Sequence, residues 1–181
     1  MREFLQTGPN SSKSRITAMV IDDDVDTVSV LSYFLKIKGI TVIGEEYDGT
    51  EAVKTFKKIK PDVVFLDVIM DKHDGFYTLK EIREIQPDAI VILITADTTE
   101  ETRQRLRKLK ASAIIYKPYD INEVMDTANK LVLKLKQELI DDINSKKALL
   151  HELNMILKSK LQKPVEGKIY EDHHFDKEKL V

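Results

Sequence analysis

The sequence predicts an α/β fold with a five-stranded doubly wound parallel sheet and a C-terminal helical extension. Five short apolar runs, rich in β-branched residues, alternate with segments of helical spacing. The runs are apolar throughout, as expected of strands that are covered on both faces. The connections are long enough for right-handed crossover helices, which make successive strands parallel.

Each predicted strand is an apolar run bounded by polar or turn residues. In the segments between them, apolar side chains recur at helical intervals, as in Val28, Leu31 and Leu35. The alternation predicts a single principal domain over residues 16–130. The five predicted strands are ITAMVI (16–21), ITVIGE (40–45), DVVFLD (62–67), AIVILIT (89–95) and SAIIY (112–116).

The two ends of the chain are predicted to lie outside this domain. Residues 1–15 are rich in Ser, Asn, Gly and Pro and predict a flexible leader, and residues 163–181 predict a disordered tail. Residues 131–162 predict a helical extension, in which Asn144 and Ser145 are expected to end one helix and cap a second. The apolar stripes of this extension have irregular heptad spacing, so they predict an element for self-association without assuring a long coiled coil.

Composition excludes several classes of function. The 31 acidic and 29 basic residues give a net charge of −2, so no overall basic field attracts nucleic acid. Residues 131–181 contain ten Lys, nine acids and no Arg, so no sequence-specific nucleic-acid surface is expected. The absence of cysteine excludes thiol chemistry. No membrane insertion is expected, because no apolar run has the length of a membrane span, and the expected location is cytoplasmic.

Reactive side chains gather at the predicted carboxyl ends of the strands, where open parallel sheets bind their ligands. Clustered carboxylates repel one another unless a cation compensates them, and an oxygen-rich cluster of this kind favours Mg²⁺. A carboxylate beside such a metal can attack a phosphoryl group, while a lysine and a hydroxyl stabilise the phosphoryl oxygens. The residues at these strand ends are Asp22, Asp23, Asp24, Asp67, Thr95 and Lys117.

The motifs VIDDD, LDVIMDKHDG, ITA and YKP, in this order and at these separations, resemble the receiver domain of two-component response regulators over about residues 16–130. The resemblance implies a flavodoxin-like fold and a Mg²⁺-dependent phosphoacceptor. It also implies that a cis bond precedes Pro118. By the same resemblance, Asp67 is the phosphoacceptor and a metal ligand, Asp23 is a direct ligand, Asp22 is a ligand through water, Ile69 is a ligand through its backbone carbonyl, and Thr95 and Lys117 bind the phosphoryl oxygens.

This resemblance implies that the chain accepts its phosphoryl group from a sensor histidine kinase or a phosphotransfer protein. Such a domain catalyses only its own phosphorylation and dephosphorylation, so it is a signalling domain and not an enzyme with a separate substrate. Output is expected through protein–protein contacts or self-association, including a homodimer through the C-terminal helices.

Two alternatives remain open. A haloacid dehalogenase-like phosphatase would use Asp22 as its nucleophile, with Asp24 beside it, but that scheme leaves Asp67 unexplained. A receiver-like scaffold that is never phosphorylated would act only by binding partners.

The chain departs from the family pattern at two positions. Asp71 stands where the family usually has proline, and Ile114 stands where it often has an aromatic switch residue. Two further positions, Ile69 and Asp97, correspond to the residues that tune the lifetime of the phosphoryl group in the family.

Overall fold

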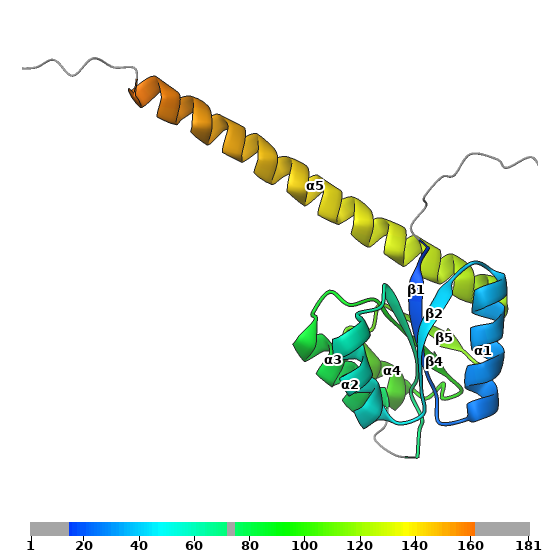
Figure 1. Cartoon of the computed structure of the whole chain (residues 1–181). Coiled ribbons are helices and arrows are strands. Elements are labelled where there is room, and N and C mark those ends of the chain that lie inside the picture. The colour runs from blue at the N-terminus through cyan, green and yellow to red at the C-terminus, as the bar shows by residue number, and fades with distance from the viewer. Residues whose placement is uncertain (1–14, 72–74, 162–181) are drawn as a thin grey trace, which may run out of the picture. The chain divides into compact units, whose positions relative to one another are not determined.

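The computed structural model describes residues 15–71 and 75–161, and within these ranges five strands alternate with five helices (Figure 1). All five predicted strands are confirmed, with ends that differ by one or two residues. The elements are β1 (Thr17–Ile21), α1 (Val25–Ile37), β2 (Thr41–Glu46), α2 (Gly49–Ile59), β3 (Val63–Asp67), α3 (Gly75–Ile85), β4 (Val91–Thr95), α4 (Glu100–Lys108), β5 (Ala113–Tyr116) and α5 (Ile121–Leu161).

The five strands form one parallel sheet in the order β2-β1-β3-β4-β5. Strand β2 therefore lies on one side of β1, and β3, β4 and β5 follow in order on the other side. The order reverses between β1 and β3, and in open α/β sheets ligands bind at such a switch point, beyond the carboxyl ends of the strands. The fold places Asp22 and Asp67 at this point, because Asp22 directly follows β1 and Asp67 ends β3.

Two apolar cores cover the two faces of the sheet. Helix α1 and the first turns of α5 pack on one face, with Leu35 and Val124 fully buried there. Helices α2, α3 and α4 pack on the other face, where Phe56, Leu79 and Leu106 are buried (Figure 1). Burial on both faces explains why the strand sequences are apolar throughout and do not alternate.

Helix α5 is continuous from Ile121 to Leu161, so the expected interruption at Asn144 and Ser145 was wrong. The Ser145 hydroxyl donates a hydrogen bond to the carbonyl of Asp141 one turn earlier, at 2.8 Å, and so satisfies its polar group within the helix. The chain divides into two compact units, residues 1–137 and 138–181. Among the residues that the structure describes, no helix is long and apolar enough to cross a membrane.

Candidate functional site

Two buried carboxylates and one lysine form the centre of the site. Asp22 and Asp67 are each only 6% exposed. The ammonium of Lys117, which follows β5, lies 2.9 Å from an oxygen of each of them. Two buried anions require a cation nearby, because an uncompensated buried charge is strongly destabilising. Lys117 supplies that charge from the end of β5, at the edge of the sheet.

The electrostatic environment shifts the pKa values of Asp67 and Lys117. Burial raises the pKa of Asp67, and the negative charge of Asp22 raises it further, while the hydrogen bond and the charge of Lys117 lower it in part. For Lys117, burial alone would lower the pKa, but the hydrogen bonds to Asp67 and Asp22 outweigh burial and raise it above the usual lysine value. Lys117 therefore stays charged at neutral pH.

Asp23 completes a group of three carboxylates that can hold a metal ion. One oxygen from each of Asp22, Asp23 and Asp67 lies within 4.8 Å of the others. In an octahedral Mg²⁺ site the ligand oxygens are about 3–4 Å apart, so these carboxylates need only a small adjustment to bind the ion. Asp23 is exposed, and its carboxylate accepts a hydrogen bond of 2.8 Å from the backbone N–H of Asp71. The residue that replaces the usual proline thus supplies a backbone donor.

Asp24, the third aspartate after β1, has a different role. Its side chain is the N-cap of α1 and accepts hydrogen bonds from the backbone N–H groups of Asp26 and Thr27. A capping carboxylate satisfies donors that a helix leaves unpaired in its first turn. The arrangement does not favour the phosphatase alternative, which needs Asp24 beside Asp22 as a catalytic carboxylate.

The loop after β3 holds the Asp67 side chain close to its own backbone. The N–H of Ile69 donates a hydrogen bond of 3.0 Å to the carboxylate of Asp67, and the Ile69 side chain is 57% exposed. Gly75, the first residue of α3, donates its N–H to the carbonyl of Val68 at 2.9 Å. A Cβ at Gly75 would lie 2.3 Å from the carbonyl oxygen of Asp67, so only glycine fits there. The sequence also predicts Asp74 as the N-cap of α3, and this residue lies outside the described residues.

The ends of β4 and β5 bring Thr95 to the same edge of the sheet. Thr95 is fully buried, and its carbonyl accepts a hydrogen bond of 2.8 Å from the N–H of Lys117. Its hydroxyl oxygen accepts a hydrogen bond of 3.0 Å from the N–H of Asp97. The peptide bond between Lys117 and Pro118 is cis, as the family resemblance implied.

A hydrogen-bond chain that sequence reasoning missed joins this edge to α4. The carboxylate of Asp97 accepts hydrogen bonds from the N–H of Thr99 at 2.7 Å and from the hydroxyl of Thr102 at 2.6 Å. These bonds, the one from Thr102 foremost, lower the pKa of Asp97. The spacing DTTEET, with an acid before a threonine N-cap, was the signal that could have revealed this chain.

The side chains of β5 near α4 define the surroundings of the expected switch position. Ile114 is partly buried and packs against the core that contains α4 residue Leu106. The guanidinium carbon of Arg103, a residue of α4, lies 5.6 Å from the centre of the Tyr116 ring. An aliphatic residue therefore fills the position where the family often has an aromatic switch, and the aromatic ring next along this face already contacts α4.

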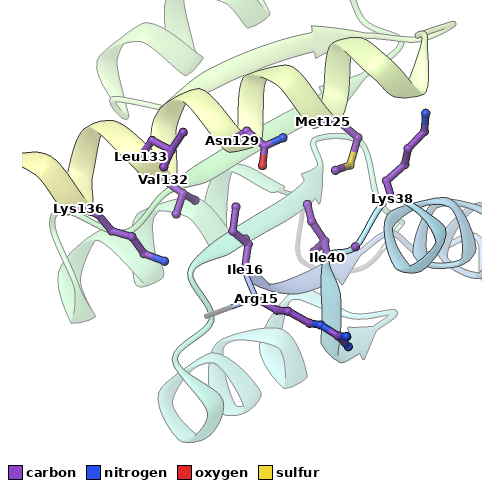
Figure 2. A pocket seen from close by; sticks show the side chains of 10 residues that line it. Arg15, Ile16, Lys38, Ile40, Met125, Asn129, Val132, Leu133 and Lys136 are labelled. Atoms are coloured by element: carbon purple, nitrogen blue, oxygen red, sulfur yellow. The ribbon is translucent and has the colours of Figure 1, made fainter. Parts of the chain in front are cut away.

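A separate hollow of about 710 Å³ lies at the amino ends of the strands, where Ile16, Ile40 and Val132 line it (Figure 2). Arg15 and Lys136 also line it, and none of the described residues that line it is acidic. The hollow lacks the carboxylates that a magnesium site needs, so it is distinct from the site at the carboxyl ends of the strands.

Comparison with known proteins identifies this arrangement. The sequence model of the response regulator receiver domain matches residues 18–129. The chemotaxis protein CheY of Thermotoga maritima is 31% identical over 113 residues, which cover 62% of this chain and 94% of that protein. The transcriptional regulatory protein PdtaR of Mycobacterium tuberculosis is 27% identical over 134 residues, which cover 72% of this chain and 65% of PdtaR. This chain thus spans less than two thirds of the length of PdtaR.

Solved structures agree with these sequence matches. The CheX-CheY-BeF3-Mg+2 complex from Borrelia burgdorferi matches with a TM-score of 0.61 and 31% identity, over 64% of this chain and 88% of that one. A CheY-like receiver domain protein from Methanospirillum hungatei JF-1, at 17% identity and a TM-score of 0.66, shares the fold over 69% of this chain and 99% of that one. Family, fold and strand-end residues agree, and the chain belongs to the response regulator receiver domain family.

Proposed function

We propose that this chain is a receiver that accepts a phosphoryl group on Asp67 in a Mg²⁺-dependent reaction. One observation carries the proposal: Asp67 lies among the carboxylates of Asp22 and Asp23 at the switch point of the sheet, with the Lys117 ammonium 2.9 Å away. Receiver domains generally bind Mg²⁺ at such an acidic cluster, and the spacing of these oxygens fits the ion.

The proposed chemistry uses groups that are already close to Asp67. A carboxylate oxygen of Asp67 attacks the phosphorus, a P–O bond forms, and the bond from phosphorus to the donor nitrogen or oxygen breaks as the donor leaves with that electron pair. Lys117 and Thr95 bind the oxygens of the transferred group. Asp23, Asp67 and the backbone carbonyl of Ile69 would hold Mg²⁺ directly, and Asp22 would hold it through water. The positive charge of the ion would offset the charge that builds up on the phosphoryl oxygens.

The donor in this proposal is a sensor histidine kinase or a phosphotransfer protein in the cytoplasm. The chain catalyses only its own phosphorylation and dephosphorylation, and its output passes through contacts with other proteins or through self-association of the C-terminal helix. The likeness to the CheX-CheY-BeF3-Mg+2 complex from Borrelia burgdorferi, which contains Mg²⁺, supports the proposed Mg²⁺ dependence.

The test is incubation with acetyl phosphate and Mg²⁺, followed by intact-protein mass spectrometry. The parent should gain one phosphoryl group that hydroxylamine removes, as expected of an acyl phosphate, and Asp67→Asn should gain none. Asp88→Asn is the matched control, because it removes the same charge from an exposed position outside the site. Labelling of Asp67→Asn would overturn the assignment, and an unlabelled parent that still binds its partners would favour the scaffold alternative.

A further inference from the structure

Residues 138–161 of α5 carry a surface that is unusual for a helix in water. Across these residues ten large apolar side chains are exposed by 44–82%. Large apolar side chains exposed in this number on one helix favour an interaction site. The exposed residues are Leu139, Ile140, Ile143, Leu149, Leu150, Leu153, Met155, Ile156, Leu157 and Leu161.

The continuity of α5 through Asn144 and Ser145 allows five of these ten side chains to occupy the core positions of one heptad register. From residue 139 to residue 157 the core positions alternate at intervals of four and three, and five of these six positions are apolar. A stripe with this 3.5-residue period is buried when two helices wind around each other. The a positions are Ile143, Leu150 and Leu157, and the d positions are Leu139, Lys146 and Leu153.

We propose that residues 139–157 form a parallel, in-register, two-stranded coiled coil with a second copy of this chain. The charges beside the stripe favour this orientation. In a parallel pair each g residue faces the e residue of the next heptad on the other helix. Asp142 at g then faces Lys147 at e of the second copy, twice by symmetry. In an antiparallel pair g faces g and e faces e, which gives no opposite-charge contact between residues 139 and 157.

Lys146, the one polar core residue, also fits a second copy of the same chain. Its ammonium lies 2.6 Å from the Asp142 carboxylate on the same helix, so the charge sits at the edge while the aliphatic stem stays on the stripe. A single polar core residue fixes register and strand number at a cost in stability. A second copy in register presents its own Lys146 and Asp142 at the same level, whereas a different apolar helix would meet an unmatched lysine.

Because the chain has no cysteine, single cysteine variants report the orientation without background. In the proposed pair the two copies of position 139 face each other with Cα atoms about 6 Å apart, which suits a disulfide. Oxidised Leu139→Cys should therefore form a covalent dimer. Ala148→Cys, at the outward f position, is the control and should not. A disulfide that forms only when Leu139→Cys is mixed with Leu157→Cys would indicate an antiparallel pair and overturn the proposal.

A second experiment measures assembly by light scattering of the full-length protein over a concentration series. The parent should have twice the 20.8 kDa mass of one chain. Leu150→Glu places a charge at an a position and should halve the mass, while Met155→Glu, at an f position, should leave the dimer intact. The pair is matched because the exposed fractions are 59% and 57%.

The proposal does not depend on phosphorylation, so its failure and that of the proposed function are separable. Asp67→Asn should remain a dimer even though it cannot be labelled, and a monomeric Asp67→Asn would overturn this independence. A monomeric parent at every concentration, a trimer or tetramer, or an equal response to Leu150→Glu and Met155→Glu would each overturn the coiled coil.

Discussion

Replacing Gly75 with alanine tests whether the close approach of α3 holds Asp67, the proposed phosphoacceptor, in place. The new Cβ would lie 2.3 Å from the carbonyl oxygen of Asp67 and 2.7 Å from the Cα of Val68. Both are backbone atoms, so no side-chain rotation relieves an overlap of about 1 Å, and either β3 or the start of α3 must move. Overpacking of this kind costs about 1–3 kcal/mol. The better helix propensity of alanine offsets less than about 1 kcal/mol of that cost.

For a chain of this size each kcal/mol lowers Tm by about 3 °C, so after this offset Gly75→Ala should melt up to about 9 °C below the parent in a circular-dichroism scan. The displaced Asp67 should also be labelled by acetyl phosphate about 100-fold more slowly, because a shift of about 1 Å at a reacting group has that effect. The time course of labelling by intact-protein mass spectrometry measures this rate.

Gly44→Ala is the matched control. Its Cβ would lie 2.6 Å from Cδ1 of Ile59 and 3.2 Å from Cγ of Met19, both in side chains that can move, and Gly44 lies in β2, away from Asp67. The control should lose stability to a smaller extent and be labelled at the parental rate. If Gly75→Ala were labelled as fast as the parent, the contact between α3 and β3 would not be what positions Asp67.

Three further substitutions test the roles of individual site residues. Asp23→Ala removes a proposed metal ligand and should weaken Mg²⁺ binding at least tenfold in isothermal titration calorimetry, and an unchanged titration would contradict the metal role. Lys117→Met leaves Asp22 and Asp67 without a cation, so in the absence of Mg²⁺ it should lower the free energy of unfolding in urea by about 3 kcal/mol. Added Mg²⁺ should restore part of this stability. Equal stability of the variant with and without Mg²⁺ would contradict the proposed charge compensation. Ile69→Asn adds a polar group that can orient water, so its phosphoryl group should decay faster than that of the parent after donor removal, and slower decay would show that another residue controls access.

Much of the fold and of the site follows from residues that are close in sequence. The strands are apolar runs, and the carboxyl ends of parallel strands meet at one edge of the sheet. The sequence therefore predicts that Asp22, Asp67 and Lys117 lie close together. The separate roles of the three adjacent aspartates after β1 were harder to predict from the sequence. Only the start of α1 decides that Asp24 caps the helix, while Asp22 turns inward to Lys117.

Other features depend on contacts that cannot be predicted from residue types alone. The hydrogen bond from Asp71 to Asp23 uses a backbone N–H, which every residue except proline possesses, so side-chain chemistry gives no hint of it. In α5, by contrast, residue types gave a signal that the structure does not follow. Asn144 and Ser145 favour helix ends in isolation, but one such pair within a long helix-forming segment is tolerated when the hydroxyl bonds to the preceding turn.

The weak anchoring of α4 has a consequence for local stability. Of its nine residues only Thr102 and Leu106 are buried, whereas β3 and β4 beside it are buried along their whole length. Segments with few buried contacts open at a lower free energy than the core, so α4 can open locally while the sheet stays closed. Thr102 also shares Asp97 with the edge of the sheet that carries Thr95. A change in hydrogen bonding at the Thr95 hydroxyl, such as the proposed phosphorylation of Asp67 would cause, would therefore alter how often α4 opens. Hydrogen exchange of the α4 amide protons would measure this change.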